Sequence, residues 1–467
     1  MELNEQRSQT AKRIALIVVC LGSAQSAMTL SSIQIAIPDI ARELRPSATM
    51  LSWIPMAFLL VNAIFILPMG RYADSVGRKK VYLAGMILFG IGNLLAGFAE
   101  NIEWVIFCRA LQGISTAMLH ATGMAIIASI YQEKERPAAL ALAASSIYLG
   151  LSFGPVAGGF LTEYFGWRSV FVAQVPVSLI CVLLVLRYLK SEWKSEEPIP
   201  VDWLGVAILG LALSCAVFSI AESAKLSSQL HTMIAPLALL LVALFASWLF
   251  LQHLKRSPTP LIRWQSIRGN SIFLSSLSSA FFVYAGNYTM VFLMSLFLQF
   301  LFSLTPSQAG LIILLQTLTI AAVSLLVGRL SPNVSDRALV CLGCGLVSLG
   351  FAILAFVDGQ SSLWIIVAAM VLNGIGMGLF TTPNNNAALG SVNPQRLSAA
   401  TAILNLARYL GNMLGTAIVM LLMVMFIGNA DISPANYSQL GNVVTLSFLF
   451  AMMAAATASV LAYRAYE

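Results

Sequence analysis

Charged residues are scarce in this sequence: they make up 10% of its 467 residues, whereas 59% are hydrophobic. A chain with so little charge cannot cover the surface of a soluble globular domain, so the composition indicates a polytopic membrane protein. The formal net charge is +7, but the cations lie in short segments between apolar runs. Membrane topology explains that placement better than nucleic-acid binding does, and we expect no nucleic-acid partner.

Cysteine and histidine are also rare. All six cysteines lie within apolar runs, which argues against a disulfide framework, and the chain has three histidines. Cys341 and Cys344 have the spacing of a redox or metal pair, but without a neighbouring histidine or a second pair they are best explained by helix packing. We predict no metal site, no cofactor and no catalytic centre, so the protein is not expected to be an enzyme. The first apolar run lacks a small-residue cleavage site and is predicted to remain as a helix.

Long apolar runs, in contrast, are abundant. About twenty apolar residues span a bilayer as a helix. The runs predict fourteen spans, at residues 14–37, 50–71, 80–99, 104–130, 138–162, 167–188, 203–221, 233–254, 271–299, 307–330, 338–357, 363–389, 398–427 and 440–463. The predicted fold class is an all-α polytopic membrane protein, and an even number of spans places both termini on the same side.

Lysine and arginine are unevenly divided between the two sides of these spans. One side holds Arg42, Arg45, Arg168 and Lys225. The other side holds the remaining loop cations, among them Arg7, Lys12, Arg13, Arg71, Arg78, Lys79, Lys80, Lys134, Arg136, Arg187, Lys190, Lys194, Lys255, Arg256, Arg263, Arg268, Arg329, Arg337, Arg396 and Arg464. Because basic loops stay in the cytoplasm, we predict a multi-pass protein of the cytoplasmic (inner) membrane with both termini cytoplasmic.

The polar segment between the second and third predicted spans is the most informative stretch. It reads Gly70-Arg-Tyr-Ala-Asp74-Ser-Val-Gly77-Arg78-Lys-Lys80. Gly70 and Gly77 favour a tight turn, and Asp74 is expected near the start of the third helix, where the helix dipole favours an anion. The spacing, residue types and position resemble the loop signature of the major facilitator superfamily. That resemblance implies that Gly70, Asp74, Gly77 and Arg78 act in conformational gating.

The same resemblance implies two six-helix halves around a midplane cavity. Gly328-Arg-Leu-Ser-Pro332, before Asp336 and Arg337, looks like a worn second copy of the Gly70 segment. We therefore predict an N-terminal half at residues 1–190, a linker with two inserted spans at residues 191–268, and a C-terminal half at residues 269–467.

The fourth predicted span carries an arginine deep in an apolar run. An ionisable residue there is by default a functional candidate. Arg109-x-x-Gln112-Gly113 resembles the helix-four motif of proton-linked members of the superfamily. Arg109 and His120 fall on one helical face, and imidazole, with an ordinary pKa of about 6.5, can titrate near neutral pH. Arg109, Gln112 and His120 are coupling candidates, while a satisfied core histidine is the alternative for His120.

The fifth predicted span contains a run of small residues around a proline. Gly150-x-x-x-Gly154-Pro155-x-x-Gly158-Gly159 resembles the antiporter motif of the superfamily's exporters. Small residues at this spacing let helices approach closely, and proline bends a span. We expect these residues to form a pliant contact between the halves that closes one side of the cavity.

Further short motifs along the chain resemble the fourteen-helix drug:proton antiporter branch. One of them is Asn405-x-x-Arg408 in the thirteenth predicted span, which adds Arg408 to the coupling candidates.

The chain departs from that branch in its first predicted span. The first span of that branch usually carries Asp, Thr and Asn, whereas this chain has Thr29, Ser31 and Gln34. Without an acid there, Arg109 and Arg408 favour neutral or anionic amphiphiles over cationic drugs.

The central cavity is expected to be lined by polar and aromatic residues of five predicted spans: the first, second, ninth, twelfth and thirteenth. Interhelical packing is an equally good explanation for each of them. The candidates are Gln25, Thr29, Trp53, Asn62, Tyr284, Asn287, Tyr288, Asn373 and Asn405.

Three functions compete at this point. The first is a proton-linked exporter of small hydrophobic or amphiphilic compounds by alternating access, with a small-molecule substrate, protons and the lipid bilayer as partners. The second is a dedicated exporter of one endogenous metabolite, siderophore or lipid-like compound, neutral or anionic. The third, a membrane enzyme or sensor, lacks any supporting motif. A monomer is expected.

Overall fold

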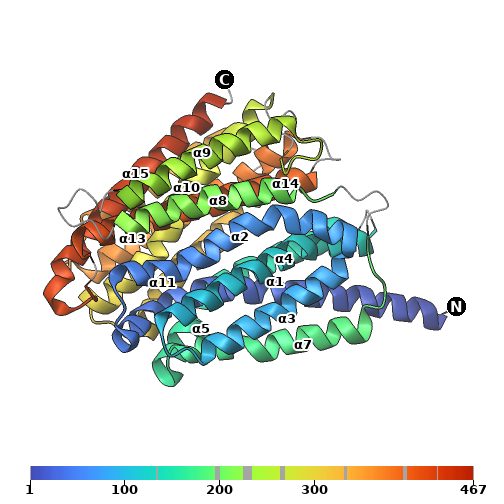
Figure 1. The fold of residues 1–467 in the computed structure, drawn as a ribbon, viewed down its shortest axis with the longest axis horizontal. Coiled ribbons are helices and arrows are strands. Elements are labelled where there is room, and N and C mark those ends of the chain that lie inside the picture. Colours follow the sequence, from blue (N-terminus) through green and yellow to red (C-terminus); the bar gives the residue numbers. More distant parts are fainter. Residues whose placement is uncertain are drawn as a thin grey trace.

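The computed structural model describes residues 2–132, 135–194, 200–223, 234–262, 269–330, 334–392, 397–428 and 430–465. Within these ranges the chain is helical without strands, and fourteen helical segments are long and apolar enough to cross a membrane, which confirms the predicted number (Figure 1). The elements are α1 (Glu2–Leu44), α2 (Ala48–Val76), α3 (Arg78–Gly97), α4 (Ile102–Ile130), α5 (Arg136–Phe165), α6 (Arg168–Val172), α7 (Gln174–Tyr188), α8 (Trp203–Glu222), α9 (Ile234–Arg256), α10 (Ser271–Leu296), the π-helix η4 (Phe297–Leu301), α11 (Pro306–Leu330), α12 (Asp336–Ala355), α13 (Leu363–Gly390), α14 (Leu397–Phe426), the short 3₁₀-helix η6 (Pro434–Asn436) and α15 (Tyr437–Ala465).

Helix ends are set by polar caps, because the first backbone N–H groups of a helix have no partner within it. Asn101 accepts a hydrogen bond from Trp104 N at 2.8 Å at the start of α4, and Asn270 accepts one from Phe273 N at 2.9 Å at the start of α10. Asp202 does the same for α8 through Gly205 N at 2.9 Å. These caps hold the turns between spans at the two ends of the bundle, where water can satisfy the rest.

The junction between α2 and α3 differs from the sequence prediction. Helix α2 continues to Val76, since the stretch after Gly70 contains no helix breaker. The expected turn at Gly70 is therefore wrong, and Asp74 lies in the last turn of α2 rather than at the start of α3. Gly77 alone separates the two helices, with φ of 127°, a value that L side chains rarely adopt.

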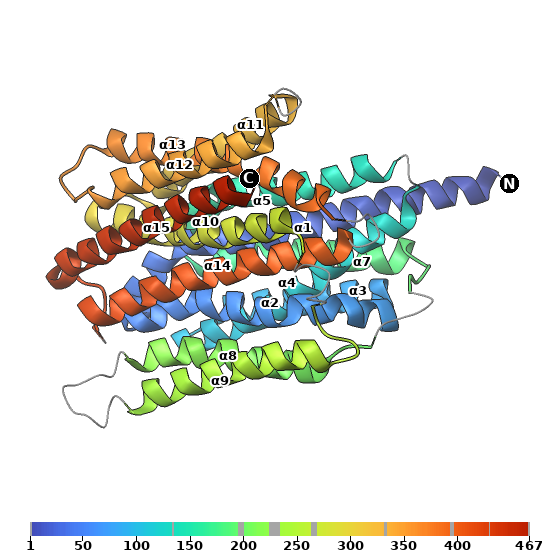
Figure 2. The same ribbon diagram turned by 90° about the horizontal axis from the view of Figure 1, so that it is seen from above.

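The spans pack in two sets joined along two seams. In the N-terminal set (α1–α7), α1 packs on α5 and α2 on α4; in the C-terminal set (α10–α15), α12 packs on α13 and α10 on α14. The seams are formed by α5 against α11 and by α2 against α14. Helices α8 and α9 pack on each other at the edge of the molecule, and α8 also contacts α2 and α14 (Figure 2).

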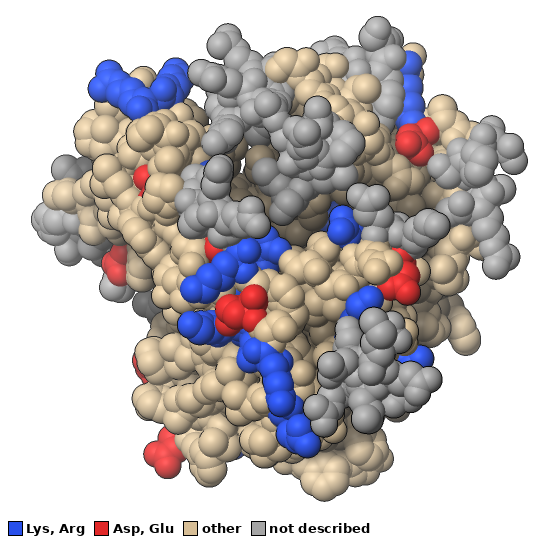
Figure 3. Space-filling model, turned by 90° about the vertical axis from the view of Figure 1, so that its right-hand side faces the viewer, with Lys and Arg blue, Asp and Glu red and all other residues tan. Residues whose placement is uncertain are grey.

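An even number of spans gives the molecule a terminal face, from which both chain ends leave, and an opposite distal face. Cations gather on the terminal face, which Figure 3 shows with a recess near its middle. The described ones at that end are Lys12, Arg13, Arg71, Arg78, Lys79, Lys80, Arg136, Arg187, Lys190, Lys194, Lys255, Arg256 and Arg337, against Arg42, Arg45 and Arg168 at the distal end. Lys134, Lys225, Arg263, Arg268, Pro332 and Arg396, and the side chains of Arg7, Arg329 and Arg464, lie outside the described part.

Candidate functional site

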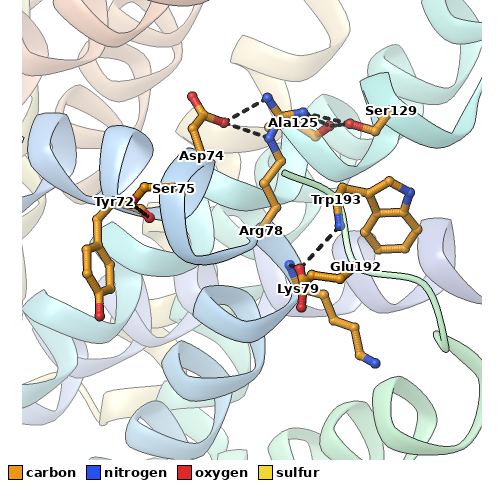
Figure 4. Close-up of polar contacts among 9 residues, drawn as sticks. All are labelled: Tyr72, Asp74, Ser75, Arg78, Lys79, Ala125, Ser129, Glu192 and Trp193. Atoms are coloured by element: carbon orange, nitrogen blue, oxygen red, sulfur yellow. Dashed lines mark hydrogen bonds and ion pairs between the residues drawn. The ribbon is translucent and has the colours of Figure 1, made fainter. Parts of the chain in front are cut away.

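The α2–α3 junction on the terminal face carries a charged clamp (Figure 4). Asp74 Oδ1 accepts from Arg78 Nε at 2.8 Å and lies 2.7 Å from Arg78 Nη2. The same guanidinium donates through Nη1 to Ser129 Oγ at 2.6 Å and to the Ala125 carbonyl at 3.3 Å. Asp74 and Arg78 thus fasten α2 and the start of α3 to the end of α4.

A third component of this junction comes from the segment after α7. Glu192 Oε1 accepts from Lys79 N at 2.9 Å, so a carboxylate from the linker caps the start of α3. Arg78 N donates to the Trp193 carbonyl at 2.9 Å. A Cβ added at Gly77 would lie 2.5 Å from Glu192 Cδ, so Glu192 would have to shift. The position of Glu192 is thus a second reason, besides the positive φ, for a glycine at position 77.

The small residues of α5 face two different partners. Gly150, Gly154 and Gly158 lie directly against α1, where an added Cβ would meet Ala24 O, Ser31 Oγ and Ser32 respectively. Gly159 faces the other set: a Cβ there would lie 2.5 Å from the Pro306 carbonyl of α11.

On the other side of this seam, Gly310 of α11 lies directly against the Pro155 carbonyl of α5. A Cβ added at Gly310 would collide with that oxygen, so the contact requires a glycine. Pro155 and Gly159 therefore form the part of the motif that crosses between the two sets, while the other glycines close α5 onto α1.

Hydrogen bonds reinforce that seam at the distal face. Gln299, within η4, donates through Nε2 to the Ile35 carbonyl of α1 at 3.0 Å, and its own carbonyl accepts from Arg42 Nη2 at 3.1 Å. Glu163 at the end of α5 accepts from Ser307 N of α11 at 3.1 Å. We call these bonds, together with the contacts of Pro155 and Gly159, the distal seal.

Arg109 is enclosed in the N-terminal set with an exposed fraction of 0%. Its Nε donates to the Ile54 carbonyl at 3.3 Å, its Nη1 donates to Gln112 Oε1 at 2.7 Å, and its guanidinium lies 4.5 Å from the centre of the Phe58 ring. Gln112 in turn donates to Asn93 at 3.3 Å. Tyr288 of α10, a residue of the C-terminal set, lies near Arg109.

His120 lies between the two sets, eleven residues along α4 from Arg109. Its Nε2 is 3.0 Å from Ser26 Oγ of α1 and its Nδ1 is 3.3 Å from Tyr409 Oη of α14. A neutral imidazole satisfies both hydroxyls, since one ring nitrogen donates and the other accepts. The residue therefore bridges α1, α4 and α14.

Arg408 of α14 is half-buried and held by two asparagines. Its Nη1 donates to Asn405 Oδ1 at 3.2 Å and its Nη2 donates to Asn385 Oδ1 of α13. The guanidinium lies 5.2 Å from the centre of the Tyr284 ring of α10. Tyr148 of α5 lies near Arg408 and Tyr284, so a residue of the N-terminal set stands beside this cluster.

A network of side-chain amides joins three helices of the C-terminal set. Gln316 Nε2 of α11 donates to Asn287 Oδ1 at 3.0 Å and to Asn373 Oδ1 at 2.9 Å. Gln316 and Asn373 are almost fully enclosed, and Gln316 Oε1 and Asn373 Nδ2 have no partner among the described residues. Unpaired amide groups of this kind can take a polar group of a bound molecule.

Several predicted cavity residues are instead engaged by neighbouring helices. Gln25 donates to Ser178 of α7 at 2.7 Å, Asn62 donates to the Gly113 carbonyl at 3.3 Å, and Trp53 packs 4.9 Å from the ring of Phe218 in α8. Thr29 and Tyr288 are buried, and their hydroxyls have no bond among the described residues that meets ordinary geometry.

Sequence reasoning missed Tyr148, Glu192, Gln316 and Asn385 as members of these clusters. Gln316 carried a signal, since it is a polar residue in the middle of an apolar run. Asn385 stands in an Asn-Asn-Asn run that resembles a helix end. Glu192 and Tyr148 gave no signal, because their roles depend on contacts with residues far away in the chain.

Comparison with known proteins agrees with this arrangement. The model of the Major Facilitator Superfamily matches residues 19–416 and 277–466. The chain therefore belongs to the Major Facilitator Superfamily of membrane transporters, and several of its relatives are named as multidrug resistance or efflux proteins.

Among those relatives, the multidrug efflux pump LfrA of Mycolicibacterium smegmatis is 30% identical over 416 residues, which cover 88% of this chain and 81% of that protein. The riboflavin transporter RibZ of Clostridioides difficile is 27% identical over 407 residues, 87% of each chain. In fold, the chain resembles a bacterial homologue of the human lysosomal transporter Spinster, with a TM-score of 0.71, 16% identity and 97% of each chain covered.

Proposed function

We propose that this transporter exports small hydrophobic or amphiphilic compounds across the cytoplasmic membrane by alternating access, with proton influx as the driving force. The observation that carries the proposal is the distal seal: Pro155 and Gly159 interlock with α11 through backbone atoms, and Gln299 bonds to the Ile35 carbonyl of α1. In this proposal the terminal face is cytoplasmic, residues 1–190 and 269–467 move as two halves, and the seal opens when they rock.

The substrate class follows from the relatives and the interior chemistry. Multidrug resistance and efflux proteins stand at 28% and 30% identity to this chain. The interior of the described spans offers aromatic rings, side-chain amides and the half-buried Arg408, groups suited to amphiphiles with polar groups. Small-molecule binding and release complete the proposed cycle without a catalytic step.

A dedicated exporter of one metabolite is the second candidate. The first span carries Thr29, Ser31 and Gln34, where the resemblance leads us to expect Asp, Thr and Asn. These three positions therefore lack the carboxylate that would attract a cationic drug. A relative named as a riboflavin transporter shows that a single-metabolite function exists at comparable identity.

Transport in inside-out membrane vesicles tests the proposal. With an acid interior, vesicles that contain the protein should take up a panel of fluorescent amphiphiles, and collapse of the pH gradient should release them. Uptake of one metabolite and none of the panel would select the second candidate. Vesicles that show no gradient-dependent uptake of either kind would contradict the proposed export.

The coupling group is the next question, because the carboxylate usual in the first span is replaced by Thr29. Arginine keeps its proton at physiological pH, which leaves His120, bound to α1 and α14, as the candidate at the seam. We expect His120→Gln to abolish pH-driven accumulation while downhill exchange continues. Substrate flux in proteoliposomes, with and without an imposed pH step, measures both. Unchanged pH-driven accumulation in the variant would exclude His120 as the proton carrier.

A further inference from the structure

The two deeply placed arginines of this transporter have different surroundings. Arg109 is fully enclosed, so a substrate cannot reach its guanidinium without a rearrangement of α2 and α4. Arg408 is half-buried, and its two terminal nitrogens rest on the Oδ1 atoms of Asn405 and Asn385. Each terminal nitrogen of a guanidinium carries two hydrogens, so a second acceptor can still bind to each of them.

No carboxylate of the described residues neutralises the charge of Arg408. The ion pairs among the described residues do not include Arg408, and both of its partners are neutral amides. A cation kept away from bulk water without an anion is costly, and the cost falls when an anion binds. Both asparagines turn Oδ1 toward the arginine, which leaves their amide nitrogens as further donors beside it.

One aromatic ring from each set lies near this cation. Tyr284 of α10 lies against the guanidinium at 5.2 Å. Tyr148 of α5 belongs to the N-terminal set, is 37% exposed and lies near Tyr284 and Arg408. A flat aromatic body that reaches Arg408 would therefore lie against Tyr284, with Tyr148 of the other set nearby.

We infer that Arg408, with Asn385 and Asn405, binds the anionic group of an aromatic amphiphile, a sulfonate, carboxylate or phosphate, whose rings lie against Tyr284 and Tyr148. The inference rests on the proposed export function and specifies its substrate class. The guanidinium supplies the charge and planar donors that match such oxyanions, and the rings supply apolar contact.

Two probes with the same rings separate charge recognition from hydrophobic binding. The anion 1-anilinonaphthalene-8-sulfonate and the neutral N-phenyl-1-naphthylamine differ by one sulfonate. Their affinities are measured with the full-length protein in nanodiscs of zwitterionic lipid, so that anionic headgroups do not compete. Arg408→Gln removes the charge, Arg408→Lys keeps it without the planar fork, and Arg187→Gln, an arginine that lies against Tyr188 in α7, is the matched control.

We expect Arg408→Gln to lower the affinity for the sulfonate, relative to the neutral probe, by about tenfold, as for loss of a hydrogen bond to a charged group. Arg408→Lys should lose less, and Arg187→Gln should leave the ratio unchanged. An equal change for both probes in Arg408→Gln, or no change for either, would overturn the inference, as would wild-type protein that does not bind the sulfonate.

The transport assay keeps this outcome apart from the fate of the proposed function. Gradient-driven uptake of the neutral probe by wild-type protein, combined with an unchanged affinity ratio in Arg408→Gln, would overturn the anion site and leave export standing. Sulfonate binding that depends on Arg408, without gradient-driven uptake of any compound, would support the site and contradict export.

Discussion

Replacement of Asp74 by asparagine is expected to slow transport about fivefold while the protein still inserts and folds. The Asp74–Arg78 pair has side-chain exposures of 38% and 24%, so water screens it and its contribution to folding stability is about 1 kcal/mol or less. Transport is nevertheless sensitive to this pair, because a bias of about 1 kcal/mol between two conformational states changes their ratio about fivefold. Transport rate in proteoliposomes and the melting temperature measure the two effects separately.

The neighbouring Ser75 provides a matched control. Ser75 is exposed, and among the described residues its hydroxyl donates only to the Tyr72 carbonyl of its own helix, at 2.9 Å, so Ser75→Ala should transport at the wild-type rate. If Asp74 acts through Arg78, the double variant Asp74→Asn with Arg78→Gln should be no slower than the worse single variant. Full transport by Asp74→Asn at normal expression would show that the clamp does not set the balance of states.

The fold was predictable from the sequence because lipid restricts a spanning chain to helices of a given length. The number of spans and their approximate places followed from the apolar runs, and the α2–α3 segment was recognised from its residues. The boundary at Gly70 was not predictable, since a glycine followed by Arg-Tyr-Ala-Asp is compatible with a turn and with a continuing helix. Packing decides in favour of the helix, which carries Asp74 to the last turn of α2, within reach of Arg78.

The candidate site was predictable only residue by residue. Arg109, His120 and Arg408 could be selected because ionisable groups are rare inside apolar runs. Their partners could not: Arg408 meets Asn385 from another helix, and His120 meets Tyr409, 289 positions further along the chain. The environments that make Arg109 enclosed and Arg408 accessible also arise from helix packing, which leaves no local pattern in the sequence.

Substitution of Gly159 by alanine is expected to open the distal seal and to reduce transport about tenfold or more. A Cβ at this position would lie 2.5 Å from the Pro306 carbonyl, a backbone atom that cannot rotate away. Overpacking of this kind typically costs about 1–3 kcal/mol, and here the cost falls on the state in which α5 and α11 are in contact. The equilibrium should therefore shift toward a state that is open at the distal face.

Gly154→Ala and Gly70→Ala complete the comparison. Gly154 packs on α1 within the same set, so its substitution should lower the melting temperature without moving the two sets apart. Gly70 has no atom within 4 Å of an added Cβ, and its substitution should change neither the melting temperature nor the separation of the sets.

Spin labels at Phe165 and Gln360, both exposed near the distal face, report the separation of the sets by pulsed electron paramagnetic resonance. The distance distribution should extend to larger values in Gly159→Ala alone. If transport is lost in Gly159→Ala while that distribution matches the wild type, α5 does not act as the distal gate and its glycines serve only to pack the helices.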